Sequence, residues 1–195
     1  HWGVNCFGRL NGEWAIAIWD EKTKKLTVCR DRYGIKPLYF SYDENQFLFS
    51  SEIKSFYELP TISVDKYMMW DQLVFGPIDG GKTFLKNVEV LMPGHYLEID
   101  VKGVNQGEYY RLEDSLRESS FTPDYDEIDY LLADSVERRL MSDVKLATIN
   151  SGGLDSSLIS SIAKQKLSGK LYTFSTAPEM ENGLKLHGDE SEYAD

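Results

Sequence analysis

The sequence predicts an α+β region followed by the start of an α/β region. Through residue 108, short apolar runs alternate with polar turns, which is the pattern of antiparallel sheets. From residue 122 onward a helix, a strand, a small-residue loop, a second helix and another strand follow, which is the order of a parallel sheet. Residues 109–121 mix charges with serine and lack periodicity, so we place a linker there, between domains at 1–108 and 122–195.

Composition bounds the class of protein. The chain has 195 residues, enough for one large or two small domains, and 42% hydrophobic residues with 13% aromatics predict a packed core. A net charge of −11 argues against nucleic-acid binding, which needs a basic footprint, but leaves room for ATP, whose phosphates need only a local cradle. No apolar run reaches the roughly 18 residues of a membrane span, and no signal peptide is visible. We therefore predict a cytoplasmic protein without membrane contact.

Two further features concern the cysteines and the ends of the chain. Cys6 and Cys29 do not make a disulfide framework or a metal-ligand spacing, and we expect Cys6 to be a small packing residue. The chain begins at His1 rather than Met, and Asp195 falls near the start of an expected helix. We therefore expect the sequence to be a piece of a longer protein.

The first sixty residues predict two antiparallel strand pairs. Residues 13–20 form a continuous apolar run, typical of a strand buried on both faces, and residues 26–30 return as its hairpin partner. Residues 37–42 and 46–50 predict the second pair. Residues 51–56 predict a short helix capped near its first residue. The charged residues Arg30, Asp31, Arg32 and Lys36 are expected to form a surface or inter-domain ion network.

The middle of the chain predicts one helix and one further strand. Residues 64–73 place Val64, Tyr67, Met68 and Leu73 on one helical face, which we expect to pack. Residues 95–100 alternate and predict a strand that ends at a turn at 102–103. His95 is expected to be a strand-end residue, because no partner for catalysis is indicated near it.

Residues 76–83 match the G-x-x-x-x-G-K-T spacing of a phosphate-binding P-loop, but the context is wrong. A P-loop opens directly into a helix, whereas residues 83–91 are Val-rich, end before Met92-Pro93-Gly94, and predict short extended pieces. Pro77 also fixes φ where a phosphate loop needs freedom. We interpret the segment as a surface connection and keep a P-loop ATPase as the weakest alternative.

The last third of the chain predicts a β-loop-α-β unit preceded by a helix. Thr122 is the expected N-cap and Pro123 the first helical residue, and Ile128, Leu131, Leu132, Val136 and Leu140 share one face. An apolar strand then runs to Asn150, a helix runs from the loop through Lys166, and residues 171–176 form the next strand. Ligands of such sheets bind at the carboxyl ends of the strands.

The loop Ser151-Gly152-Gly153-Leu154-Asp155-Ser156-Ser157 has the chemistry of an anion cradle. Its two glycines permit backbone conformations that bring N–H groups and the free N–H groups of the helix start to one point, and the serines can add hydroxyl donors. Asp155 would repel a phosphate unless Mg²⁺ lies between them, and Mg²⁺ is usually held by one or two carboxylates plus phosphate oxygens. The alternative is a Gly-rich strand-to-helix turn with a serine cap and no ligand.

This loop resembles the pyrophosphate-binding loop of the ATP-pyrophosphatases, and its sequence is most similar to that of the glutamine-dependent asparagine synthetases. A second resemblance, to the later half of a class II glutaminase domain, rests on residues 9–12, 30–39, 50–54 and 83–97. That domain is an N-terminal-nucleophile hydrolase with two stacked antiparallel sheets. Together the resemblances cover nearly the whole chain and imply incomplete glutaminase sheets joined to the start of a parallel-sheet ATP-pyrophosphatase domain.

The resemblance implies that the chain is part of a glutamine-hydrolysing asparagine synthetase, in which ATP adenylates aspartate and ammonia from glutamine displaces AMP. It implies that Ser151, Gly152, Gly153, Ser156 and Ser157 bind the diphosphate and that Asp155 holds Mg²⁺. Backbone groups of Ile149 and Thr176 would bind adenine and ribose. The family often pairs subunits, which implies a homodimer.

No catalytic residue is assigned within the chain. The family's nucleophile is a cysteine at the mature N-terminus, which Cys6 is not, and its glutamine-binding residues lie upstream of His1. We therefore expect the chain alone to be catalytically incomplete.

One residue departs from the family pattern, and two other functions stay open. The family usually has an apolar residue before the loop serine, where this chain has Asn150, and the change bears on the strand end and on nucleotide affinity. The first alternative is a related amidotransferase whose acceptor is a sugar, peptide or β-lactam precursor. The second is a binding or scaffold module that has lost catalysis.

Overall fold

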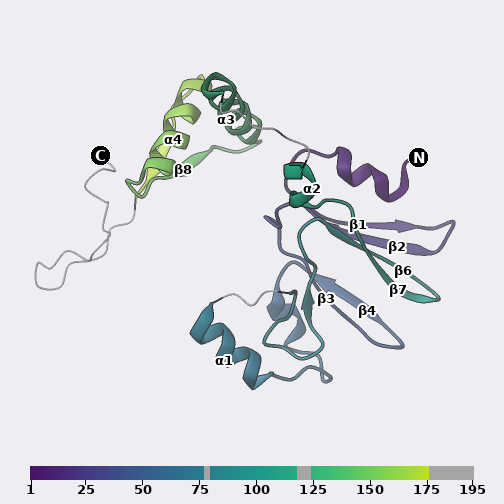
Figure 1. The fold of residues 1–195 in the computed structure, drawn as a ribbon. Helices are drawn as coiled ribbons and strands as arrows, with labels where there is room; N and C mark the ends of the chain where they lie inside the picture. The colour runs from purple at the N-terminus through teal and green to yellow at the C-terminus, as the bar shows by residue number, and fades with distance from the viewer. Residues whose placement is uncertain (77–79, 118–123, 176–195) are drawn as a thin grey trace, which may run out of the picture. The chain divides into compact units, whose positions relative to one another are not determined.

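The computed structural model describes residues 1–76, 80–117 and 124–175 of the chain (Figure 1). The chain divides into two units, His1–Ser119 and Ser120–Asp195, which are described separately. Antiparallel sheets occur in the first unit and a parallel strand pair in the second. The predicted α+β region followed by the start of an α/β region is thus confirmed.

The larger sheet of the first unit contains β1 (Ala15–Asp20), β2 (Lys25–Arg30), β6 (His95–Asp100) and β7 (Gly103–Glu108) in that order. All neighbours are antiparallel, and the predicted hairpin is present as β1 and β2. Strand β6 has the bounds that the alternation predicted. The sheet therefore joins segments that lie about seventy residues apart in the sequence (Figure 1).

The smaller sheet has the order β4-β3-β5, from β3 (Tyr39–Tyr42), β4 (Phe47–Ser50) and the short β5 (Glu89–Val90). The predicted pairing of β3 with β4 is confirmed. One buried cluster joins both sheets, and its members are Val28, Leu38, Phe40, Leu91 and Leu97. Burial of these side chains is the main force that holds the sheets together.

Strand β1 is less covered than its sequence predicted. Its residues are half-buried or exposed, with Ile18 at 46% and Trp19 at 54% of full exposure. In the described part of the chain β1 pairs with β2 alone, so one edge is free of strand partners. The prediction of burial on both faces is wrong here, because an apolar run records the hydrophobicity of a strand and not which elements cover it.

The helices of the first unit are short: η1 (Gly3–Arg9), η2 (Ile53–Phe56), α1 (Lys66–Phe75) and α2 (Leu112–Arg117). The predicted short helix is present as the single 3₁₀ turn η2. Its N-cap is Glu52, next to the predicted Ser51, and the Glu52 side chain makes no capping hydrogen bond. Helix α2 falls within the segment where we placed the linker.

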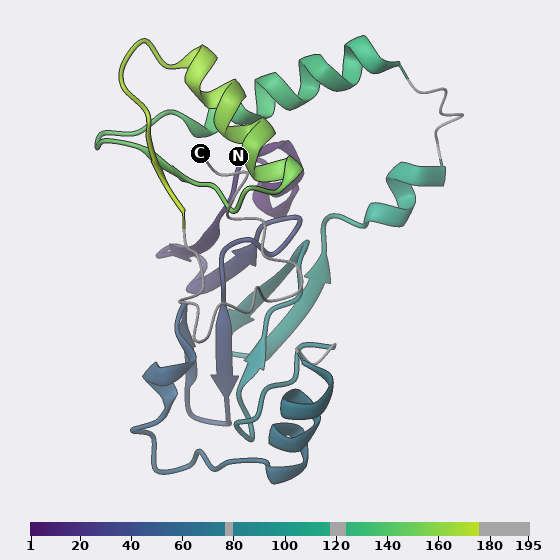
Figure 2. The same cartoon turned by 90° about the vertical axis from the view of Figure 1, so that its left-hand side faces the viewer.

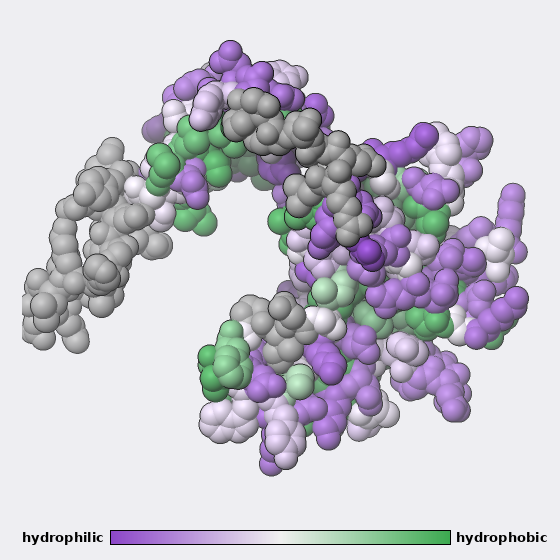
Figure 3. Space-filling model, in the orientation of Figure 1, coloured by the Kyte–Doolittle hydropathy of each residue, from purple (hydrophilic) through white to green (hydrophobic). Residues whose placement is uncertain are grey.

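Helix α1 packs less than its pattern predicted. The Asp65 carboxylate caps it by accepting hydrogen bonds from the N–H groups of Tyr67 and Met68. No residue of the helix is buried, and Tyr67 and Leu73 are 83% and 70% exposed. Figure 3 shows hydrophobic side chains on the surface where this helix lies. Capping therefore defines the helix, while the expected packing of its apolar face is wrong among the described residues.

The second unit begins with α3 (Tyr125–Arg139), followed by β8 (Ala147–Ile149), α4 (Leu154–Lys166) and β9 (Tyr172–Phe174). Strands β8 and β9 are parallel with α4 as their connection, so the predicted β-loop-α-β unit is confirmed. The views of Figures 1 and 2 show α3 beside α4, and the Lys166 ammonium lies 2.7 Å from the Glu137 carboxylate between them. Val136 and Ala163 are buried in this unit.

The N-cap of α3 differs from the predicted one. The Asp124 carboxylate accepts hydrogen bonds from the N–H groups of Asp126 (3.0 Å) and Glu127 (3.3 Å), which makes Asp124 the cap. Thr122 and Pro123, the expected cap and first helical residue, lie outside the described residues. Asp124 can cap the helix because its carboxylate, two residues after Thr122, accepts hydrogen bonds from N–H groups of the first turn.

We expect Asp124→Ala to lower the free energy of unfolding of the second unit by about 1 kcal/mol, because two first-turn N–H groups lose their acceptor. The control is Asp129→Ala, which removes the same charge from an exposed position inside the same helix. Urea unfolding followed by helical circular dichroism measures both variants. Equal losses would show that charge, and not capping, accounts for the effect.

Among the described residues, no helix combines the length and the apolar character needed to cross a membrane.

Candidate functional site

The loop that follows β8 is anchored by the parallel strand pair. The N–H of Asn150 donates to the carbonyl oxygen of Phe174 at 2.9 Å, which extends the pairing of Ile149 with Phe174 by one step. The loop therefore leaves the carboxyl end of β8 next to the carboxyl end of β9. This is the edge of a parallel sheet where ligands bind.

The backbone of the loop leaves the start of α4 without a side-chain cap. Gly152 has φ of +87°, a conformation that glycine adopts at little cost, and Gly153 is the N-cap in an extended conformation. Helices α1 and α3 are capped by Asp65 and Asp124, whereas no side chain caps α4. The first-turn N–H groups of α4 are thus left for another acceptor, which is the arrangement of an anion site.

The predicted serines gather around the side chain of Asn150. The Oδ1 atom of Asn150 accepts hydrogen bonds from the N–H of Gly152 (3.0 Å) and from the hydroxyls of Ser156 (3.0 Å) and Ser157 (3.3 Å). The Ser151 and Ser156 hydroxyl oxygens lie 3.1 Å apart. The structure therefore brings five donors and acceptors of the loop to one point. From the sequence, Asn150 was noted only as a departure from the apolar residue that the family usually has there. Its position at the centre of these hydrogen bonds was not predicted.

Two other predicted residues, Asp155 and Ile149, lie next to this point in different ways. Asp155 is in the first turn of α4 with an exposed side chain. Ile149 ends β8, and its side chain is 76% exposed, so its backbone is what faces the strand pairing. Thr176, the second residue expected to contact adenine and ribose, lies outside the described residues.

The donor set fits a nucleotide diphosphate with Mg²⁺ better than a metal alone. Among the described residues, no group of three or more His, Cys, Asp or Glu side chains could hold a metal. A single exposed carboxylate beside uncapped N–H groups suits Mg²⁺, which keeps several waters and shares its remaining ligands with phosphate oxygens. Asp155 is the residue that would hold the ion.

The described end of the P-loop-like segment, residues 80–83, lacks two features of a phosphate loop. No helix follows it in the described residues 83–88, and Thr83 is buried with its hydroxyl 2.7 Å from the carbonyl oxygen of Val88. In a P-loop this hydroxyl would bind Mg²⁺. The weakest alternative is therefore contradicted at its threonine.

Gly81, the second glycine of the G-x-x-x-x-G-K-T spacing, has a structural explanation. Gly81 has φ of +79°, and a Cβ atom there would lie 2.8 Å from the carbonyl oxygen of Val90. The carbonyl of Gly81 also accepts the N–H of Val90. A close backbone approach thus explains the glycine without a ligand. Pro77, which we used in the same argument, lies outside the described residues.

The charged residues around position 31 only partly form the predicted surface ion network: the Lys36 ammonium lies 3.4 Å from the Glu13 carboxylate, whereas Asp31 is satisfied differently. Asp31 is 1% exposed, and its carboxylate accepts N–H groups from Trp14, Tyr33, Ile35 and Lys36 at 2.9–3.3 Å. Burial alone would raise the pKa of Asp31, but these hydrogen bonds outweigh it and hold the pKa below its usual range. The prediction is wrong for this residue, because backbone N–H groups and not cations satisfy the carboxylate.

Arg30 extends the same scaffold. Its guanidinium donates to the carbonyl oxygens of Gly34 (2.6 Å), Lys36 (2.8 Å) and Leu91 (2.8 Å), which ties the loop after β2 to the strand region near β5. Cys29 beside it is fully buried, and burial raises the pKa of its thiol to about 11. Such a thiol stays protonated at neutral pH, so the cluster is structural rather than nucleophilic.

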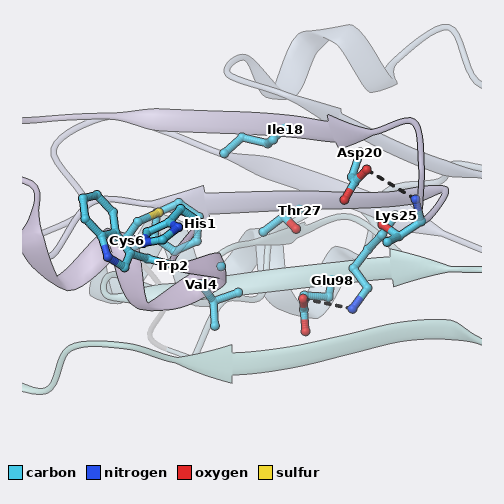
Figure 4. Close-up of a pocket in the computed structure, with 12 residues that line it drawn as sticks. His1, Trp2, Val4, Cys6, Ile18, Asp20, Lys25, Thr27 and Glu98 are labelled. Carbon is cyan, nitrogen blue, oxygen red and sulfur yellow. Dashed lines mark hydrogen bonds and ion pairs between the residues drawn. The ribbon is translucent and has the colours of Figure 1, made fainter.

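The first unit also contains a cavity of about 470 Å³ beside η1 (Figure 4). Its walls include His1, Trp2, Cys6, Ile18 and Thr27. At one end the Lys25 ammonium lies 3.2 Å from the Glu98 carboxylate, so these two charges neutralise each other. Cys6 is half-buried, in line with the packing role expected for it. The cavity offers mostly apolar surface, and we place the candidate site at the 150–157 loop instead.

Comparisons with known proteins match two family models to two separate parts of the chain. Residues 1–110 match the model of the glutamine amidotransferase domain, and residues 127–195 match that of asparagine synthase. A glutamine-hydrolysing asparagine synthetase 3 of Bacillus subtilis is 37% identical over 165 residues, 83% of this chain and 27% of that protein. A putative asparagine synthetase 2 of Methanocaldococcus jannaschii is 33% identical over 186 residues, 89% of this chain and 35% of that protein.

Not all relatives carry the synthetase name. The amidase chry2 of Gibberella zeae is 34% identical over 177 residues, 85% of this chain and 26% of that protein. The chain thus spans between a quarter and about a third of the length of these three relatives.

Proposed function

Because the chain belongs to the glutamine amidotransferase domain family and continues into the start of an asparagine synthase domain, we propose that it is part of a glutamine-hydrolysing asparagine synthetase. The whole enzyme would amidate aspartate at the expense of ATP, with nitrogen from glutamine. We assign residues 1–108 to the glutaminase part, 109–121 to a linker and 122–195 to the synthetase part. A cytoplasmic homodimer is proposed as the working form.

One observation carries the proposal. The loop after β8 presents uncapped N–H groups of α4 and three serine hydroxyls at the carboxyl edge of a parallel strand pair. Gly152 and Gly153 let the backbone approach the diphosphate, and Ser151, Ser156 and Ser157 add hydroxyl donors. These groups are fixed by the fold before the reaction starts, so they can stabilise the charge of departing pyrophosphate without rearranging.

We propose two further roles, which follow from the family resemblance. Asp155 would hold Mg²⁺, which supplies neutralising charge when bound with the phosphates. Backbone groups of Ile149 and Thr176 would hold adenine and ribose. In the reaction, a carboxylate oxygen of aspartate attacks the α-phosphorus and pyrophosphate leaves. Ammonia then forms the C–N bond of the amide as AMP leaves.

The products of ATP test this function. The complete protein that contains this chain is incubated with Mg²⁺, ATP, glutamine and aspartate. Asparagine, AMP and pyrophosphate are then quantified. We expect the three in equal amounts, because cleavage falls between the α- and β-phosphates. Formation of ADP and inorganic phosphate would contradict the proposal, since a loop that grips the diphosphate as leaving group cannot release ADP. Asparagine formation by residues 1–195 alone would contradict the expectation that this chain is incomplete.

A second function shares the same chemistry with a different acceptor. Two relatives are named amidases, chry2 of Gibberella zeae and chyE of Penicillium rubens, at 34% and 33% identity. A sugar, peptide or β-lactam precursor in place of aspartate would keep the roles of the loop unchanged. The same assay decides, because AMP and pyrophosphate would then form with such an acceptor and not with aspartate. A non-catalytic scaffold would release neither.

A further inference from the structure

The side chain of Asn150 occupies the point at which the loop's donors converge. Its Oδ1 atom accepts hydrogen bonds from the N–H of Gly152 and from the hydroxyl of Ser157. The Ser156 hydroxyl lies 3.0 Å from the same Oδ1 atom and 3.1 Å from the carbonyl oxygen of Gly153, so these two oxygens share its one hydrogen. The backbone N–H of Asn150 is held by Phe174, so the strand pairing fixes where the side chain starts. The residue is half-buried, and its carboxamide lies against the loop through these contacts.

These three donors are also donors that the proposed function assigns to the diphosphate. A hydroxyl has one hydrogen, and a hydrogen given to Oδ1 of Asn150 is not given to a phosphate oxygen. Gly152 likewise has a single N–H. The carboxamide oxygen and an anion oxygen therefore compete for the same groups, and both cannot hold all three at once.

We propose that Asn150 is an internal stand-in for the diphosphate, which keeps the loop's donors satisfied until the nucleotide displaces it. This inference rests on the proposed function, because it concerns the same loop. A neutral carboxamide makes weaker hydrogen bonds than a charged phosphate, so Mg–ATP can displace it. The displaced side chain has solvent on its exposed side. Asn150 thus raises the nucleotide concentration at which the loop fills, and it preserves the loop's order when nucleotide is absent.

The test is calorimetric titration of Mg–ATP and of Mg–pyrophosphate into the full chain and its variants. Asn150→Leu removes the competing oxygen at similar size, and we expect about tenfold tighter binding of both ligands. Asn150→Asp places a fixed negative charge at the same donors, and we expect binding at least tenfold weaker than that of the wild type. Asn105→Leu, at an exposed strand position of the first unit, is the matched control and should bind as the wild type does.

The outcomes separate this inference from the function on which it rests. If Asn150→Leu binds Mg–ATP as tightly as the wild type or more weakly, the inference that Asn150 occupies the place of the diphosphate is overturned. The proposal that the loop binds nucleotide is then unaffected. If neither protein binds Mg–ATP or Mg–pyrophosphate, the nucleotide loop itself fails. If a variant does not fold, NMR spectroscopy of the wild-type protein provides an independent test. The side-chain NH₂ resonances of Asn150 should move when Mg–ATP binds. Saturating nucleotide that leaves those resonances in place overturns the inference.

Discussion

In the complete protein that contains this chain, Asp155→Ala is expected to lower ATP-dependent amide formation by on the order of a hundredfold, because the variant loses the carboxylate that we propose as the Mg²⁺ ligand of the loop. The side chain is exposed in the first turn of α4 and packs against nothing that the fold needs. The loss should therefore appear in turnover and not in the free energy of unfolding. Initial rates of pyrophosphate release at several Mg²⁺ concentrations measure it, and excess Mg²⁺ should recover part of the rate.

A matched control separates the metal from general charge. Asp143→Ala removes the same charge from an exposed position of the same unit, between α3 and β8. We expect this variant to retain the wild-type rate and the wild-type Mg²⁺ dependence. Similar losses in both variants would mean that Asp155 acts through the long-range field of the protein, and its assignment as the Mg²⁺ ligand would have to be withdrawn.

Asp31→Ala is expected to destabilise the first unit by about 3–5 kcal/mol, because a buried acceptor is lost and four backbone N–H groups are left without it. Losses of this size are a large share of the stability of a small domain. Urea unfolding followed by tryptophan fluorescence measures the loss. Asp43→Ala is the control, because Asp43 also accepts backbone N–H groups but lies at an exposed turn. We expect it to cost less than about 1 kcal/mol.

The Asp31 carboxylate should also make the free energy of unfolding of the first unit fall at acid pH. The pKa of Asp31 is lower in the folded chain than its unfolded value of about 3.9. Its contribution is therefore complete above pH 4 and is lost as the pH falls through the lowered folded pKa. Asp31→Asn keeps the shape of the side chain but cannot titrate, so its unfolding free energy should depend less on pH below 4. An unchanged acid profile would show that other carboxylates account for acid unfolding.

Local patterns predicted the strands well, because alternation and turn residues are properties of a few neighbouring residues. Strand β6 and the hairpin of β1 and β2 follow directly from them. Burial was predicted less well. The apolar run of β1 and the apolar residues of α1 indicated packing, yet Trp19 and Leu73 are exposed, because hydrophobicity cannot say which segment covers a face.

The candidate site was predicted in its residues but not in its internal contacts. Glycine and serine at fixed spacing after a strand indicate an anion loop from chemistry alone. The place of the Asn150 side chain depends on how the end of β8 is held against Phe174, which is a contact between segments distant in the sequence. The role of Asp31 was hidden for a different reason, since its partners are backbone N–H groups, most of them from the next few residues, which any sequence could supply.

The most direct measurement follows the glycine amides of the chain while nucleotide is added. The protein is labelled with ¹⁵N-glycine, and Mg–ATP is titrated against its amide spectrum. The account predicts that the resonances of Gly152 and Gly153 move at saturating nucleotide, while those of Gly80 and Gly81 in the P-loop-like segment stay in place. Movement at Gly80 and Gly81 with Gly152 and Gly153 unchanged would contradict it, because the phosphates would then bind to the first unit and not at the end of β8.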